Sequence, residues 1–175
     1  MPLSDNQLHY FISYVVVFVI FGLIARWYPW PALKDRTPRT ALTPLLLYAA
    51  FRANGLMFSM PGLVSPQLPK AFAISTACGD LTAALLALLA LWPLRAERRE
   101  AMPMVWFFNI VGVFDLIYAN VSTFKDHVDP TYLGVSYYLA AVKRACHAVC
   151  TRLDLRVLAE AWRYMVQKSA GGEVR

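Results

Sequence analysis

Charged residues are scarce in this chain of 175 residues. Asp, Glu, Lys and Arg together make up 16% of it and apolar residues make up 58%, whereas a typical soluble domain has about 25% charged and 45–50% apolar residues. This balance excludes an ordinary water-soluble domain and indicates an integral membrane protein whose main partner is the lipid bilayer. The length accommodates four or five spans of about 20 residues each.

The usual signatures of catalysis and cofactor binding are also missing. The three cysteines are too few and too scattered for a disulfide framework, and there is no G-x-S-x-G motif or glycine-rich phosphate loop. The segment CHAVC places Cys146, His147 and Cys150 within about one helical turn, but His147 points away from the line that joins the cysteines. The sequence therefore predicts no metal ion and no cofactor, it leaves any catalytic residue unidentified, and it leans toward a protein that is not an enzyme.

A nucleic-acid-binding motif is absent as well, although the formal net charge is +6. The Lys and Arg residues cluster between apolar runs and near the C-terminus, where basic residues commonly set the topology of a membrane protein beside anionic lipid headgroups. We therefore expect no nucleic-acid partner.

Long apolar runs are what the sequence has in abundance. Four spans are predicted at about residues 9–25, 41–60, 74–94 and 102–124. They should be helical, because a backbone inside lipid must satisfy its own hydrogen bonds. The expected fold is an all-α, polytopic transmembrane helix bundle over residues 1–142, followed by a basic, partly helical tail over residues 143–175.

A fifth crossing from about residue 131 is less well defined, because its apolar run ends at Lys143 and Arg144. Either this segment crosses the membrane with these cations paired or reaching toward the interface, or it lies on the outer surface as an amphipathic helix. The loops after the first and third runs are basic, and the tail beyond Val142 carries seven Lys and Arg residues. This bias favours the crossing and an N-terminus that faces outward.

Three charged residues interrupt the predicted spans: Arg52 in the second, Asp80 in the third and Asp115 in the fourth. With the N-terminus outside, all three lie in the outer half of the bilayer at similar depth, where they can form a buried network. Each charge alone would cost about 2.5–3.5 kcal/mol on an insertion scale. The cluster either binds a polar ligand or relays a proton, or it is an ion-pair network that fixes the packing of the helices.

Three asparagines provide further polar groups within these spans. Asn109 and Asn120 are eleven residues apart and therefore share a face of the fourth run, and Asn54 lies in the second. Hydrogen bonds between helices are a more common role for such side chains than ligand binding. We expect them to support the charged cluster.

Part of the sequence resembles a group of small, uncharacterised bacterial integral membrane proteins through the segments PGLVSP, GDL…ALLALLAL and WxFNxxGxxDLxxA. The matching residues are Pro61, Gly62, Ser65, Pro66, Gly79, Asp80, Leu81, Trp106, Asn109, Gly112, Asp115 and Leu116. The resemblance covers about residues 51–138 and implies a four- or five-helix bundle in the bacterial inner membrane, with no activity to transfer. After residue 138 the sequence departs from the apolar last helix of that group, through either a divergent tail or a shifted reading frame.

The resulting hypothesis is a membrane protein that binds or conducts a small polar solute or ion through Arg52, Asp80 and Asp115. The alternatives are a structural or assembly subunit, and a membrane enzyme that acts on a lipid or quinone. A water-accessible cavity that reaches Asp80 would favour the first, a sealed cluster the second, and a lipid-width slot beside the cluster the third. The oligomeric state is not specified by the sequence.

Overall fold

The computed structural model describes residues 5–126, 128–134 and 136–171, and these residues contain no β-strand. In chain order they form α1 (Asp5–Trp27), α2 (Pro29–Leu33), α3 (Pro38–Ala50), the 3-10 helix η1 (Phe51–Ser59), α4 (Lys70–Arg95), α5 (Ala101–Lys125), the short 3-10 helix η2 (Pro130–Leu133) and α6 (Ser136–Gly171). The prediction of an all-α fold is confirmed.

Four helical segments are long and apolar enough to cross a membrane: Phe11–Leu33, Pro38–Ser59, Lys70–Arg95 and Ala101–Thr123. Each overlaps one of the four spans predicted from the sequence. The expectation of a polytopic membrane protein is confirmed by the length and composition of these segments.

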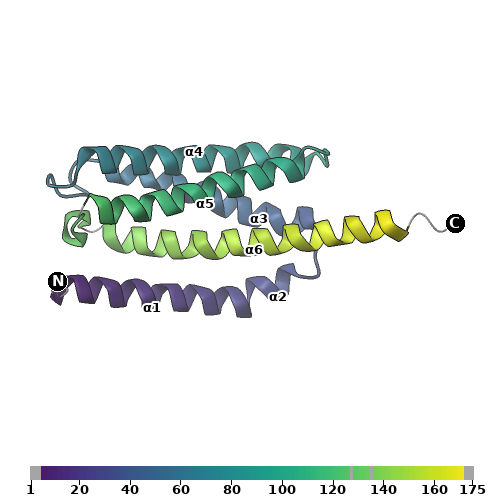
Figure 1. Ribbon diagram of the computed structural model, residues 1–175, viewed down its shortest axis with the longest axis horizontal. Helices are drawn as coiled ribbons and strands as arrows, with labels where there is room; N and C mark the ends of the chain where they lie inside the picture. The colour runs from purple at the N-terminus through teal and green to yellow at the C-terminus, as the bar shows by residue number, and fades with distance from the viewer. Residues whose placement is uncertain (1–4, 127, 135, 172–175) are drawn as a thin grey trace.

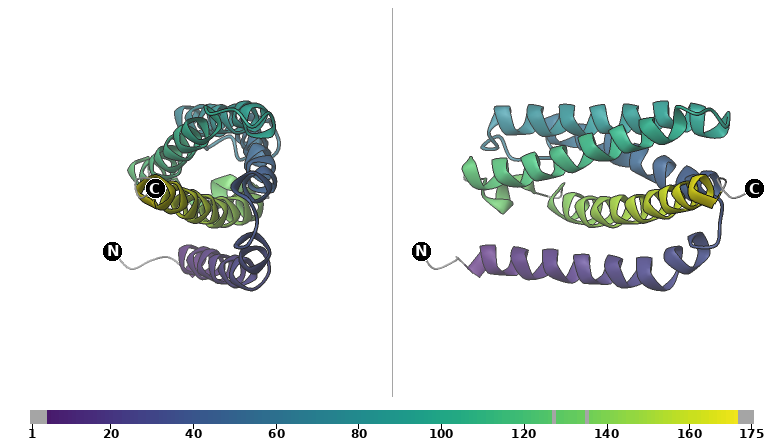
Figure 2. Two further views of the ribbon diagram at one scale, coloured as in Figure 1. Left: turned by 90° about the vertical axis from the view of Figure 1, so that its right-hand side faces the viewer. Right: turned by 45° about the vertical axis from the view of Figure 1, so that its right-hand side comes forward.

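The helices α3, α4, α5 and α6 surround a common core, and α1 lies outside them, packed against α6 (Figure 1, Figure 2). The core is filled by small and branched side chains from all four helices, among them Ala41, Leu46, Ala87, Val105 and Val157. Small residues at helix contacts let backbones approach closely, which is how helices associate within lipid.

The last helix, α6, is continuous over 36 residues. At a rise of 1.5 Å per residue it is about 54 Å long, whereas the hydrocarbon core of a bilayer is about 30 Å thick. It runs beside the other helices and projects beyond them at its C-terminal end (Figure 1). The boundary predicted after Val142 falls inside this helix. In the described part of the chain α6 is not one of the four strongly apolar segments, so its crossing stays a prediction, and residues 172–175 of the predicted tail lie outside the described residues.

The second span changes its helix type halfway. After α3 ends at Ala50, residues Phe51–Ser59 continue as the 3-10 helix η1. Runs of 3-10 helix longer than three or four residues are uncommon, and Asn54 and Gly55, two weak α-helix formers, lie in the middle of this one. A Cβ added at Gly55 would lie 2.6 Å from Cγ of Asp80. The glycine is therefore what allows η1 to approach α4 so closely.

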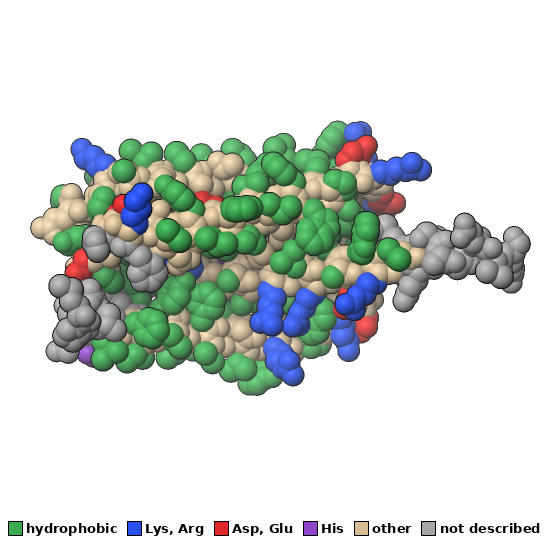
Figure 3. Space-filling model, in the orientation of Figure 1, with side chains coloured by type: hydrophobic (Ala, Val, Ile, Leu, Met, Phe, Trp, Pro, Cys, Tyr) green, Lys and Arg blue, Asp and Glu red, His purple; other side chains and the backbone are tan. Residues whose placement is uncertain are grey.

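The surface is mainly apolar in the middle, and charged side chains lie mostly toward the ends (Figure 3). On the face shown in Figure 3, hydrophobic side chains cover most of the middle, and Lys and Arg gather mainly toward the end from which α6 projects. The connections that follow α1 and α4 lie at this same end, and α1 begins at the opposite end (Figure 1). The loops that the sequence places on one side of the membrane therefore share one end of the molecule.

Candidate functional site

Four charged side chains meet inside the bundle, and each comes from a different element. Arg52 lies on η1, Asp80 on α4, Asp115 on α5 and Lys143 on α6. Arg52 and Asp80 are only 2% and 4% exposed. The structure thus brings together the three residues that the sequence placed at similar depth, and it adds a lysine. We call these four residues the charged cluster.

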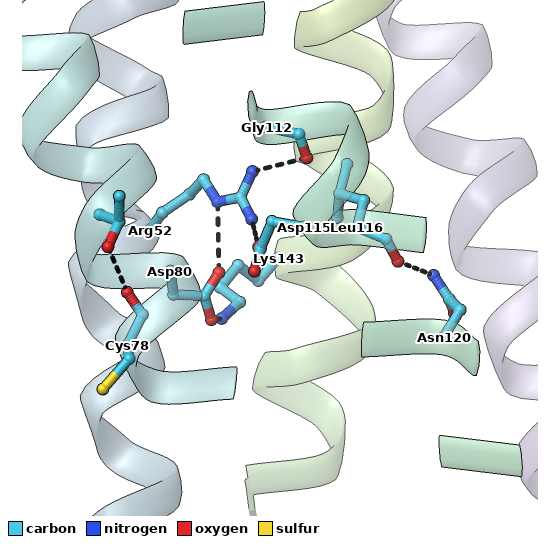
Figure 4. Close-up of polar contacts among 9 residues, drawn as sticks. Arg52, Cys78, Asp80, Gly112, Asp115, Leu116, Asn120 and Lys143 are labelled. Carbon is cyan, nitrogen blue, oxygen red and sulfur yellow. Dashed lines mark hydrogen bonds and ion pairs between the residues drawn. The ribbon is translucent and has the colours of Figure 1, made fainter. Parts of the chain in front are cut away.

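The Arg52 guanidinium holds the charged cluster together (Figure 4). Its Nε donates a hydrogen bond to Oδ1 of Asp80 at 3.2 Å, and its Nη1 donates to the backbone carbonyl of Gly112 at 3.3 Å. Its Nη2 forms an ion pair with Asp115, and the ammonium of Lys143 forms another with Asp80. The pairs therefore run as a chain from Asp115 through Arg52 and Asp80 to Lys143.

Lys143 was not among the site residues that the sequence singled out. In the sequence it is only a cation that interrupts the apolar run of the last helix and needs either a partner or access to the interface. Its side chain is 12% exposed, and its partner is Asp80. With Lys143 included, the charged cluster holds two cations and two anions, so its net charge is zero.

Glycines on α4 and α5 make room for these contacts. A Cβ added at Gly79 would lie 2.8 Å from Cγ of Asp115, and one added at Gly112 would lie 3.3 Å from Nη1 of Arg52. The absence of a side chain at Gly79 therefore leaves space for the Asp115 carboxylate where it pairs with Arg52. Close approach of helix backbones is the usual reason for glycine at such positions in a membrane bundle.

The three asparagines do not join the charged cluster by any hydrogen bond within the described residues. Nδ2 of Asn109 donates to the carbonyl of Val105 at 2.9 Å, and Nδ2 of Asn120 donates to that of Leu116 at 2.7 Å. Both bonds lie inside α5, to the carbonyl one turn back, and not between helices as expected. Asn54 lies elsewhere, on the wall of a pocket.

This pocket, the η1–α6 pocket, has a volume of about 590 Å³ and lies next to the charged cluster. Small-molecule sites typically measure about 300–1,000 Å³. Its lining residues with polar groups are Tyr48, Asn54, Lys143 and His147, and its apolar ones include Phe51, Leu56, Met57, Met60 and Leu139. Because Lys143 lines the pocket and also pairs with Asp80, the charged cluster forms part of the pocket boundary.

His147 is the second polar side chain that α6 contributes to the pocket. It follows Lys143 by four residues and therefore shares its face of the helix. The residue is 3% exposed, its ring lies 5.7 Å from that of Tyr48, and its Nε2 has no hydrogen-bond partner among the described residues. The sequence drew attention to His147 only through the CHAVC motif; its spacing from Lys143 was the more informative signal.

The two cysteines of the CHAVC motif do not line the η1–α6 pocket. Cys146 and Cys150 are free thiols that line a second pocket, of about 340 Å³, beside α1. Among the described residues, no group of three or more His, Cys, Asp or Glu side chains is arranged to hold a metal ion. His147 therefore lines one pocket and the two cysteines line another, as their positions around the helix predict.

Asp154 is a further buried acid on the inner face of α6. It is 1% exposed, and its Oδ1 has no hydrogen-bond partner among the described residues. It follows His147 by seven residues, so Lys143, His147 and Asp154 lie along one stripe of the helix. Nothing in the sequence distinguished this residue from the other charges of the basic tail.

We predict that Asp154→Leu raises the stability of the detergent-solubilised protein, because a buried polar group without a partner typically costs about 1–3 kcal/mol. Thermal unfolding measures the change. Asp126→Leu is the matched control, since Asp126 is exposed and its replacement should change stability little. A marked loss of stability in the Asp154 variant would contradict the prediction and indicate a partner for this carboxyl group.

Comparison with known proteins finds no significant match to a curated protein or to a solved structure. A family model does match: it is described as a domain of unknown function, DUF8737, and it covers residues 9–158. The match includes all four residues of the charged cluster and also residues 139–158, where the sequence departs from the group that it resembles. Because the match extends over most of its length, the chain belongs to the DUF8737 family.

Proposed function

We propose that this membrane protein binds a small molecule in the η1–α6 pocket and that the charged cluster forms one end of the binding site. The observation that carries the proposal is the position of Lys143, which lines a pocket of about 590 Å³ and pairs with the buried Asp80. A network that only fixed helix packing does not require an adjoining cavity, so the cavity beside Lys143 favours a binding role. Ionisable residues inside a membrane most often mark functional sites.

The irregular second half of the second span supports this proposal. Non-α-helical backbone at membrane depth is tolerated where it is buried in protein or lines a cavity, and broken helices form the binding sites of many transporters. Here η1 does both: Arg52 enters the charged cluster, and Phe51, Asn54 and Met57 line the pocket.

A structural role for the charged cluster is the second candidate, and its balanced charge favours it. Two cations and two anions satisfy one another, and glycines at positions 55, 79 and 112 fit closely around them. Such a network can hold four helices in register without any ligand. The two roles are compatible, and the pocket distinguishes them.

We further propose that the protein resides in a bacterial inner membrane with its N-terminus outside. The resemblance to small bacterial membrane proteins supports the location. The concentration of Lys and Arg in the loops at one end of the molecule supports the orientation, because cytoplasmic loops carry an excess of these residues. Five crossings by α1, α3–η1, α4, α5 and α6 would place the basic C-terminal part of α6 on the cytoplasmic side.

The proposal predicts that blocking the pocket abolishes binding. Leu139 lines the η1–α6 pocket and is 59% exposed, so Leu139→Trp should obstruct it without disturbing the core. The probes are three photoreactive compounds with the same decyl chain and diazirine, which carry an alcohol, a carboxylate or a trimethylammonium head group. In lipid nanodiscs, at least one should label residues 51–60 and 139–147 of the parent, and the variant should lose that labelling.

Leu85→Trp is the matched control, because Leu85 lies on α4 away from this pocket and is 52% exposed. It should label like the parent. The proposed function is wrong if none of the probes labels the pocket residues above the lipid-facing background, or if Leu139→Trp leaves the labelling unchanged.

A further inference from the structure

We infer that the η1–α6 pocket takes a neutral, lipid-soluble molecule with a hydroxyl or carbonyl head group, and that His147 binds this head group. This inference rests on the proposed function and specifies its ligand class. The chemistry is that of long-chain alcohols, prenols and quinones. Access from the membrane, the balance of charge and the unpaired histidine nitrogen each support it.

The mouth of the pocket is apolar and exposed. Phe51, Met60 and Leu139 line it and are 64%, 50% and 59% exposed. Phe51 belongs to a segment that is long and apolar enough to span the membrane, so side chains at this depth face acyl chains. A ligand that reaches the pocket past such residues comes from the lipid phase and brings an apolar body with it.

The charge balance of the cluster selects a neutral head group. Lys143, the only Lys or Arg among the residues that the structure places on the pocket wall, already pairs with Asp80, and Asp80 also accepts from Arg52. A carboxylate or ammonium head group would therefore add one uncompensated charge to a site of low polarity. Burial of an unpaired charge is strongly unfavourable.

His147 supplies the hydrogen bond that a neutral head group needs. Its Nε2 is buried and has no partner within the described chain, although the side chain lines the pocket. An imidazole nitrogen donates or accepts according to its tautomer, so it can pair with a carbonyl or with a hydroxyl group. A ligand in the pocket would satisfy an atom that the protein leaves unsatisfied, and the ring of Tyr48 from α3 lies beside the imidazole.

The test compares the three head groups on the parent and on His147→Phe in nanodiscs. The alcohol probe should label the pocket of the parent more strongly than the carboxylate or trimethylammonium probe. His147→Phe keeps an aromatic ring against Tyr48 and removes the hydrogen bond. It should weaken alcohol labelling about threefold to tenfold, the effect of one neutral hydrogen bond, and should leave the thermal midpoint of the protein unchanged or raised, because no partner of Nε2 is lost.

The outcomes separate this inference from the proposed function. If a charged probe labels the pocket best and Leu139→Trp abolishes that labelling, the pocket binds ligands but the neutral head group is wrong. If alcohol labelling is unaffected by His147→Phe, the role of His147 is wrong. If no probe labels the pocket, the proposed function fails together with the inference. A quinone with a decyl chain, used as a competitor, should reduce alcohol labelling; if it does not, the carbonyl head group is wrong.

Discussion

Asp80→Asn is expected to lower the thermal stability of the detergent-solubilised protein more than Asp115→Asn. Asp80 pairs with two cations, Arg52 and Lys143, and its side chain is 6% exposed. Asp115 pairs with Arg52, and its side chain is 13% exposed. Neutralising Asp80 leaves two buried cations to share one carboxylate, and breaking a buried pair in this way typically costs about 3–5 kcal/mol.

A charge-balanced double variant is the control for this prediction. Asp80→Asn combined with Lys143→Gln removes one anion and one cation and leaves the Arg52–Asp115 pair intact. It should recover part of the stability that Asp80→Asn loses, and the double-mutant cycle gives the coupling between the two residues. Equal losses for Asp80→Asn and Asp115→Asn, or no loss for either, would contradict a buried network centred on Asp80 and would indicate that water reaches these charges.

The charged cluster was partly predictable because depth in a membrane follows from sequence. A helix rises by a fixed distance per residue, so the position of each charge within its span placed Arg52, Asp80 and Asp115 at one level. Burial followed from the cost of exposing a charge to lipid. The same reasoning did not identify Lys143 as a member, because the ends of the last helix could not be located within a mixed apolar and basic sequence.

The pocket could not be predicted in the same way. Its shape depends on the switch from α3 to η1 at Phe51, and hydropathy does not distinguish a 3-10 helix from an α-helix. The roles of His147 and Asp154 depend on which face of α6 meets the bundle, and this face was not apparent while residues 143–175 were interpreted as a tail. Amide side chains such as Asn109 can bond to their own helix or to a neighbour, and sequence alone does not decide between these partners.

The second large effect is expected at Gly55. Gly55→Ala adds a Cβ that would lie 2.5 Å from Cβ of Asp80 and 2.6 Å from its Cγ. A Cβ contact cannot be relieved by rotating the side chain, so η1 must move away from α4, which stretches the bond between Arg52 and Asp80. Overpacking of this kind typically costs about 1–3 kcal/mol, and thermal unfolding of the detergent-solubilised variant measures it.

Two other glycines provide a graded comparison. Gly112→Ala meets only the end of the Arg52 side chain, at 3.3 Å, and should cost less than Gly55→Ala; Gly22→Ala in α1 has nothing within 4 Å and should be neutral or slightly stabilising. Equal effects at all three positions would show a general response to glycine replacement and not the close approach of η1 to α4. The graded order would instead show that glycine is required at the contact between η1 and α4. This contact positions Arg52 on one side of η1 and the pocket-lining residues on the other.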